Sequence, residues 1–166
     1  MIFVTVGTHE QPFDRLVGYI DQMKEKQVIT EEVVVQTGFC TYVPRNCVWK
    51  NMFSYEDMIK NMERARIIIT HGGPSSFITA LQLGKIPIVV PRQRRYHEHV
   101  NDHQLQFAKE VAERNGNLVV VEDIKQLDNL ILKYNDIIQS MPVEIKSNNS
   151  SFNVKLEKIV QGMSVI

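Results

Sequence analysis

The sequence predicts one three-layer α/β domain, in which a parallel sheet is covered by helices on both faces. Two observations support this fold class. Short runs of β-branched residues are apolar throughout, as strands are when both of their faces are buried. Stretches with helical spacing of apolar residues separate these runs, as right-handed crossovers between parallel strands require. The runs occupy residues 2–6, 33–35, 67–69, 86–90 and 118–121.

The intervening stretches predict the helices in order. Residues 13–23 have apolar side chains at helical spacing, and Pro12 suits a first helical turn. The same spacing recurs in residues 58–65, 105–112 and 127–138. Residues 39–51 are less regular, and we expect a loop with a short strand there.

The C-terminal segment differs in composition from the rest of the chain. We expect a globular domain over residues 1–141, followed in residues 142–166 by a polar linker containing S-N-N-S-S and an amphipathic C-terminal helix. The apolar stripe of this helix, from Phe152 to Met163, can pack on its own domain or on another chain.

Composition narrows the class of protein. With 166 residues, 43% apolar and 23% charged, the chain has the profile of a globular domain with a proper core. Basic and acidic residues balance at 19 each, which gives no net charge to attract nucleic acid. Cys40 and Cys47 are too few for a disulfide framework, so we expect inert thiols and a cytoplasmic location. No apolar run approaches the ~20 residues that span a bilayer, and the start lacks the features of a signal peptide.

In a parallel sheet, ligands bind beyond the carboxyl ends of the strands, so the loops that follow the strands are the candidate site. The first loop begins with Gly7 and Thr8, followed by His9 and Glu10. A glycine there lets backbone approach a ligand, and the next helix offers N–H groups to a phosphate. Because such turns often carry glycine, this loop alone indicates little.

The second loop is more informative. A Gly-Gly pair alone favours a structural turn, but here a histidine and two hydroxyl residues share the turn, which favours a phosphate site. Ser75 or Ser76 can cap the following helix or bind a phosphate oxygen. The predicted phosphate-binding residues are His71, Gly72, Gly73, Pro74, Ser75 and Ser76.

The third loop, residues 91–104, combines cations with a polar cluster. Arg92, with Arg94 and Arg95, can neutralise phosphate or belong to a solvated basic loop. The polar cluster supplies the mixed donors and acceptors that sugar hydroxyls need, although one member can serve only as a helix cap. Its members are Asn101, Asp102, His103 and Gln104.

A zinc site is an alternative for this loop. His99 and His103 are four residues apart, so on a helix both would face the same side. No H-E-x-x-H or C-x-x-C pattern accompanies them, and we therefore expect no metal and no other cofactor.

Residues 65–108 resemble the C-terminal, donor-binding domain of the family-28 GT-B glycosyltransferases. The order of strand, T-H-G-G turn, helix, L-G-K-x-P, strand and D-H-Q carries this resemblance. The opening F-V-T-V-G-T is similar to the catalytic subunit of the two-subunit dolichol-linked N-acetylglucosamine transferase. The segment E-H-V-N-D-H-Q is similar to bacterial capsule and exopolysaccharide glycosyltransferase subunits. The resemblance implies a Rossmann-like fold equivalent to one half of a GT-B enzyme.

It also implies roles for particular residues. Gly7 and Thr8 would line the diphosphate and acceptor side, and Phe53 and Ser54 would hold the uracil ring, partly through backbone. The polar cluster of the third loop would contact the donor sugar. Many relatives grip the ribose with a glutamate at the position of Thr79, and a single hydroxyl cannot chelate a diol in that way.

The implied function is transfer of a sugar from a UDP-sugar to a polyprenyl-linked saccharide, with inversion, in capsule or exopolysaccharide synthesis. Because the chain has length for only one GT-B half, a membrane-associated partner would supply the acceptor-binding half and hold the protein at the membrane. His9 and Glu98 are the candidate bases in this chain, although the base can lie in the partner. The alternative is a non-catalytic module that binds nucleotide sugar or stabilises the partner.

Overall fold

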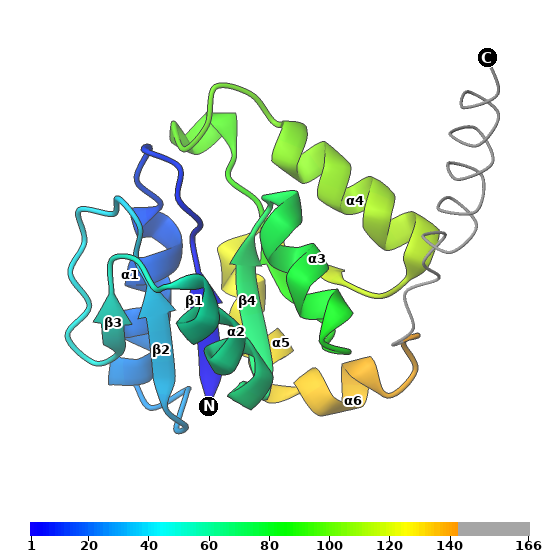
Figure 1. Ribbon diagram of the computed structural model, residues 1–166, viewed down its shortest axis with the longest axis horizontal. Coiled ribbons are helices and arrows are strands. Elements are labelled where there is room, and N and C mark those ends of the chain that lie inside the picture. Colours follow the sequence, from blue (N-terminus) through cyan, green and yellow to red (C-terminus); the bar gives the residue numbers. More distant parts are fainter. Residues whose placement is uncertain (143–166) are drawn as a thin grey trace, which may run out of the picture.

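A computed structural model describes residues 1–142 and shows a six-stranded parallel sheet in the order β3-β2-β1-β4-β5-β6 (Figure 1). All five neighbouring strand pairs are parallel, as the apolar runs predict. The first strand occupies the centre, and the chain reverses its direction of winding between β1 and β4. The strands are β1 (Ile2–Thr5), β2 (Val33–Gln36), β3 (Val48–Lys50), β4 (Ile67–His71), β5 (Ile88–Val90) and β6 (Val119–Val120).

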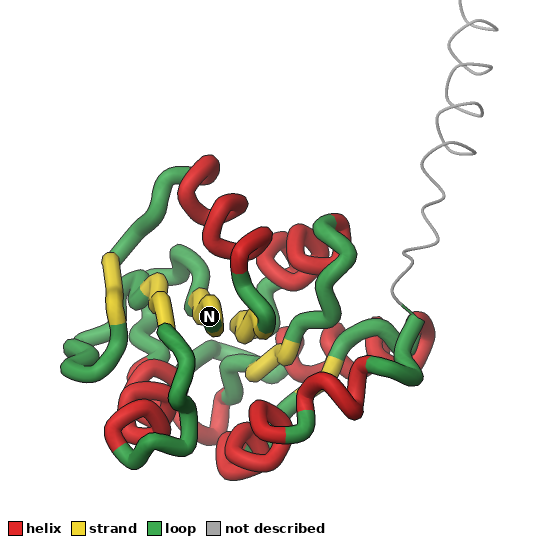
Figure 2. Tube along the Cα trace, turned by 90° about the horizontal axis from the view of Figure 1, so that it is seen from below, coloured by secondary structure: helices red, strands yellow, loops and turns green. Residues whose placement is uncertain are grey.

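Helices cover both faces of this sheet, and Figure 2 shows them on either side of the row of strands. The three-layer prediction is therefore confirmed. The helices are α1 (Asp14–Glu25), α2 (Tyr55–Arg64), α3 (Pro74–Gln82), α4 (His103–Asn115), α5 (Leu127–Leu132) and α6 (Tyr134–Ile138), and two 3-10 turns occupy Arg94–Tyr96 and Ile124–Gln126.

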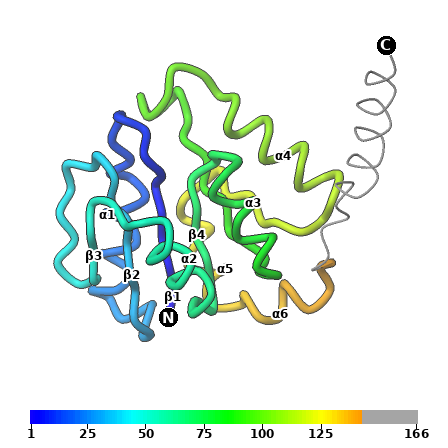
Figure 3. The backbone as a smooth tube through the Cα atoms, viewed as in Figure 1, coloured from blue at the N-terminus to red at the C-terminus, as the bar shows by residue number. Residues whose placement is uncertain are grey.

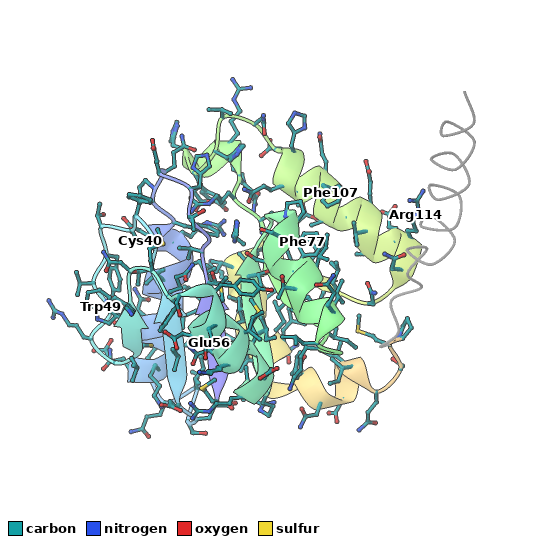
Figure 4. All side chains as sticks on the ribbon, in the orientation of Figure 1. Cys40, Trp49, Glu56, Phe77, Phe107 and Arg114 are labelled. Carbon is teal, nitrogen blue, oxygen red and sulfur yellow. The ribbon has the colours of Figure 1, made fainter. Side chains whose placement is uncertain are left out.

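Strand alternation divides the core between the two faces. Val4 and Ile69 belong to a large cluster that packs against α1, α5 and α6. Phe3 and Ile68, one residue earlier in each strand, point to the other face and pack against α2 and α3. A third cluster joins α3 and α4, where Phe77 and Phe107 have ring centroids 6.0 Å apart (Figure 4). The sheet is thus buried on both sides.

Two details differ from the expectations. Pro12 lies ahead of α1, whose N-cap is Phe13, and Pro74 takes the first-turn position of α3 instead. The stripe in residues 127–138 forms two short helices because the chain breaks at Lys133. The predicted C-terminal helix lies outside the described residues. No helix among residues 1–142 is long and apolar enough to cross a bilayer.

Residues 39–51 form the predicted loop with a short strand, β3. Two carboxylates of α1 hold this loop: Asp14 accepts the backbone N–H of Thr41 (2.8 Å), and Asp21 accepts that of Asn46 (2.8 Å). Cys40 and Cys47 are free and half-buried. Burial raises the pKa of the Cys40 thiol to about 11 and that of Cys47 to about 12, so both stay protonated and unreactive near neutral pH.

The carboxyl ends of the parallel strands share one edge of the sheet. The loop after β1, the turn after β4 and the long connection from β5 to α4 all lie along this edge, at the top of Figure 3. Three segments that are far apart in sequence therefore meet where the site was expected.

Candidate functional site

The turn after β4 brings a helix start directly to the end of a buried strand. His71 ends β4, Gly73 is the N-cap of α3 in an extended conformation, and Pro74 begins the helix. No side chain caps this helix, so the predicted capping role of Ser75 or Ser76 is wrong. Because the first turn of a helix leaves its N–H groups without intrahelical acceptors, the amides of Gly73 and Ser75 are available to an anion.

Two glycines enclose the imidazole of His71. A Cβ added at Gly73 would lie 2.2 Å from His71 Nε2, and one added at Gly7 would lie 2.4 Å from His71 Cε1. Gly7 also has a φ of +76°, which side chains rarely tolerate. The glycines of the first and second loops are therefore required by close packing around one ring, which the sequence patterns did not reveal.

His71 is uncharged at neutral pH. Burial, followed by the nearby charge of Arg92, lowers the pKa of this imidazole to about 4. Its Nδ1 is buried without a hydrogen-bond partner in the described structure. Positive potential at this turn therefore comes from backbone amides and the helix dipole, and not from an imidazolium.

A pocket of about 490 Å³ lies between this turn and α4. It joins the second loop to the third, because its walls come from the start of α3 and from residues 99–110. The lining residues are Gly72, Pro74, His99, Asn101, His103, Gln104, Gln106, Phe107 and Glu110. Of the predicted phosphate-binding residues, Gly72 and Pro74 line this cavity, and of the predicted sugar-binding residues, Asn101, His103 and Gln104 line it. His71, Gly73, Ser75, Ser76 and Asp102 lie outside the lining.

Gln104 connects the pocket to the loop behind it. Its Oε1 accepts the backbone N–H of Arg92 (3.2 Å), which directs the amide nitrogen elsewhere. Its Cβ lies 2.7 Å from the position of a Cβ added at Gly72, so only glycine fits there. Asp102 turns away to accept the backbone N–H of Arg94 (2.9 Å), and Asn101 accepts that of His103 (3.2 Å). Asp102 is the N-cap of α4 but makes no capping bond with its side chain.

Arg92 is not part of a solvated basic loop. Its side chain is buried, with only 1% of the residue exposed, and the guanidinium donates to backbone carbonyls. It therefore reaches no open phosphate surface. Arg94 and Arg95, by contrast, are exposed.

Of the two candidate bases, His9 is the more exposed, and its Nδ1 accepts the backbone N–H of Gln11 (3.1 Å). Glu98 is buried, and its two oxygens bind Arg15 Nε (2.6 Å) and Nη2 (2.8 Å). Its Oε2 also accepts the backbone N–H of Gln93 (3.1 Å), so the structure argues against Glu98 as a base. His9 is exposed, and its ring lies 5.2 Å from that of His99 on the pocket wall. Desolvation, followed by the charges of Arg92 and His99, lowers the pKa of His9.

The other predicted residues lie outside the pocket lining. Thr8 is exposed on the first loop. Ser54 caps α2 by accepting the N–H of Asp57 (3.1 Å), and Phe53 stacks edge-on against Phe3 at 6.0 Å. The hydroxyl of Thr79 donates to the Ser75 carbonyl (2.7 Å), as hydroxyls inside helices often do.

The zinc alternative assumes that His99 and His103 lie on one helix, and this assumption is wrong. His103 begins α4, whereas His99 lies in the loop before it, so the two do not share a helix face. In residues 1–142, no group of three or more metal-ligating side chains gathers.

Several pocket residues escaped the sequence patterns. Phe107 lies four residues after His103 and three after Gln104, so helical spacing from the polar cluster was a usable signal for it. The same spacing extends to Glu110. Nothing in the sequence indicated the pairing of Arg15 with Glu98, which are 83 residues apart.

The chain is similar in sequence to known glycosyltransferase proteins. The chain is 29% identical over 126 residues to the human UDP-N-acetylglucosamine transferase subunit ALG13, which covers 70% of the chain and 10% of that protein. It is 34% identical over 68 residues to the same-named protein of Yarrowia lipolytica, covering 40% of the chain and 33% of that protein. The chain thus spans a third or less of these relatives.

Among solved structures, the "Glycotransferase of kitacinnamycin" superposes with a TM-score of 0.52 at 18% identity, covering 80% of the chain and 34% of that structure. This likeness shows the fold alone. The Glycosyltransferase family 28 C-terminal domain matches residues 1–161, which is nearly the whole chain. The chain therefore belongs to the family of glycosyltransferase family 28 C-terminal domains.

Proposed function

We propose that this chain is the donor-binding, catalytic subunit of an inverting glycosyltransferase that takes its sugar from a UDP-sugar. One observation carries the proposal: the uncapped start of α3 and the polar cluster of the third loop line the same pocket. A diphosphate needs the first feature and a sugar needs the second. A purely structural Gly-Gly turn would not require an adjoining cavity that is lined in part by polar side chains.

In this mechanism, the diphosphate lies at the amides of Gly73 and Ser75. The amides and the dipole of α3 stabilise the charge that develops on the departing UDP. Gln104 and His103 orient the sugar. The acceptor hydroxyl attacks the anomeric carbon from the opposite face, which inverts its configuration, while His9 or a residue of the partner takes the proton. This route uses no metal ion.

The names of the relatives favour N-acetylglucosamine as the first sugar to test. In our proposal the acceptor is a polyprenyl-linked saccharide of capsule or exopolysaccharide synthesis, and the resemblance of the segment E-H-V-N-D-H-Q to such subunits supports this choice. Because Thr79 stands where many relatives have a glutamate, the ribose must be bound differently in this protein.

A partner completes the enzyme in this proposal. The relatives named as transferase subunits favour a second, acceptor-binding component. We infer that this component is membrane-associated and holds the chain at the cytoplasmic surface.

The test measures binding and transfer separately. The chain should bind UDP, and Gln104→Ala should weaken binding of the UDP-sugar about tenfold while UDP alone binds within about twofold of wild type. Labelled sugar should pass to a polyprenyl-linked acceptor only when the partner is co-expressed. UDP-sugar binding without transfer in the complex would favour the alternative, a non-catalytic nucleotide-sugar module. Equal loss of UDP and UDP-sugar in Gln104→Ala would remove Gln104 from the sugar site.

A further inference from the structure

Arg92 occupies an unusual position for a cation in a loop. It lies two residues after the end of β5, and only 1% of the residue is exposed. Burying a charge is costly unless hydrogen bonds and counter-charges compensate for the lost water. The contacts of Arg92 therefore indicate why this position carries arginine.

The guanidinium holds the first loop along its length. Nη2 donates to the carbonyl of Val6 (3.1 Å), at the start of the loop. Nη1 donates to the carbonyls of Gln11 (2.7 Å) and Pro12 (3.1 Å), at its end. The loop is thus fixed at both ends by one side chain, and its middle carries His9.

The same side chain contacts the third loop. Nη1 also lies 3.4 Å from the carbonyl of Glu98, the residue before His99. The carboxylate of Glu98 binds Arg15 of α1 and supplies negative charge near both arginines. The guanidinium also stacks over the ring of Phe13, 4.8 Å from its centroid. Arg92 therefore lies between the two loops that carry His9 and His99.

We propose that Arg92 is a positioning residue whose guanidinium clamps the first loop to the third, so that His9 is held against His99 at the edge of the donor pocket. A lysine cannot replace it, because an ammonium has no planar fork to serve carbonyls on several sides. The diphosphate turn belongs to β4 and α3 and shares no hydrogen bond with the guanidinium. The clamp therefore affects the placement of His9 and not the affinity for UDP. Only its consequence for transfer rests on the proposed function.

The charge of Arg92 also affects the pKa of His9, which provides a second measurement to test the clamp. His9 faces Glu10, Arg92, His99 and His71, and the Arg92 charge helps to lower the pKa of His9. Arg92→Lys keeps this charge and removes the fork, whereas Arg92→Met removes both. The two variants separate geometry from electrostatics. Arg94→Met is the matched control, because it deletes an exposed cation from the same loop.

The experiment uses the full chain and isothermal titration with UDP, together with NMR of imidazoles and amides. In Arg92→Lys we expect amide exchange in residues 8–11 to rise about tenfold or more and the His9–His99 contact to be lost. UDP affinity should stay within about twofold of wild type. In Arg92→Met the pKa of His9 should also rise. Arg94→Met should leave amide exchange, the His9–His99 contact, UDP affinity and the pKa of His9 unchanged. Unchanged exchange with the contact retained in Arg92→Lys would overturn the clamp, and a tenfold loss of UDP affinity would make Arg92 a phosphate ligand instead.

A measurement on the wild-type protein keeps the proposal testable if these variants fail to fold. The guanidinium protons of Arg92 should exchange slowly and show hindered rotation, while those of exposed Arg94 should not. Equal, rapid exchange at both would contradict the clamp. If wild-type protein binds no UDP, the proposed donor site fails, but the exchange measurements still decide whether Arg92 joins the loops.

Discussion

The two strand-to-helix turns at the centre of the sheet look alike in sequence but differ in what they offer a ligand. Both follow a buried strand, and both place a glycine against His71. After β4 the helix starts within three residues, with no side-chain cap. After β1 the chain continues to Asp14 before α1 begins, and the sulfur of Cys40 accepts the N–H of Phe13 (3.2 Å) at that helix start.

This difference shows why one glycine turn suits an anion better than the other. The start of α1 is covered by its own chain, since the loop from Cys40 to Tyr42 packs on it and donates to Asp14. The start of α3 opens to the pocket. A glycine marks a possible turn, but the position of the next helix start decides whether free amides face a ligand.

Among these substitutions, Gly73→Ala should lower UDP affinity the most, because it changes the turn that we assign to the diphosphate. The new Cβ would lie 2.2 Å from His71 Nε2, and the imidazole cannot retreat because Gly7 packs on its other side. We expect UDP affinity and transfer to fall at least about a thousandfold, roughly 4 kcal/mol. Titration calorimetry measures the affinity, and Gln82→Ala at the far end of α3 is the control. Wild-type affinity in Gly73→Ala would place the diphosphate elsewhere.

The buried His71 between the two turns should make stability depend on pH. Its pKa is lowered from 6.5 to about 4, so the unfolded state binds more protons between these values. The contribution of His71 to the free energy of unfolding is fully present above pH 6.5. It is lost as the pH falls towards about 4, and the loss amounts to roughly 3 kcal/mol. Urea unfolding of wild type and His71→Gln across this window measures the difference. Parallel pH slopes in the two proteins would refute the assignment.

Gly7→Ala, in the turn after β1, should lower the stability of the fold more than it lowers UDP affinity. It therefore tests whether the two turns differ in function. An alanine at a φ of +76° and 2.4 Å from His71 Cε1 is strained. We expect the free energy of unfolding to fall by about 1–3 kcal/mol. UDP affinity of the folded protein should fall far less than in Gly73→Ala. Denaturant unfolding and calorimetry give the two values, and equal losses of affinity would make the turns equivalent.

The smallest effect is expected at a capped helix. The side chain of Ser54 caps α2 by accepting the N–H of Asp57, whereas α3 has no side-chain cap. Ser54→Ala should lower the free energy of unfolding by about 1 kcal/mol, as lost caps commonly do. UDP affinity should stay near wild type if the uracil contact uses backbone. A large loss of affinity would assign the hydroxyl itself to the nucleoside.

Local pattern was sufficient for most of the fold. The apolar runs at residues 2–6 and 67–69 identified the central strands, because a strand buried on both faces leaves no polar alternation. The break at Lys133 was not predictable, since apolar spacing continues through it. The order of the strands was available only through the family resemblance.

The site was predictable where chemistry and chain position coincide. The turn at residues 71–76 and the cluster at residues 101–104 follow strands, and half of these residues line the pocket. Arg92 and Glu98 were misread because their burial depends on partners distant in sequence: Val6 for Arg92 and Arg15 for Glu98. A sequence shows that a residue is charged, but it does not show that other loops will enclose it.

The most direct test of the central claim is to follow backbone amide resonances while UDP is titrated into the isotopically labelled chain. The amides of Gly73 and Ser75 should shift most, with the Gln104 side-chain amide moving once a sugar is attached to the nucleotide. If those two amides stay unmoved while UDP saturates the protein, the start of α3 is not the diphosphate site.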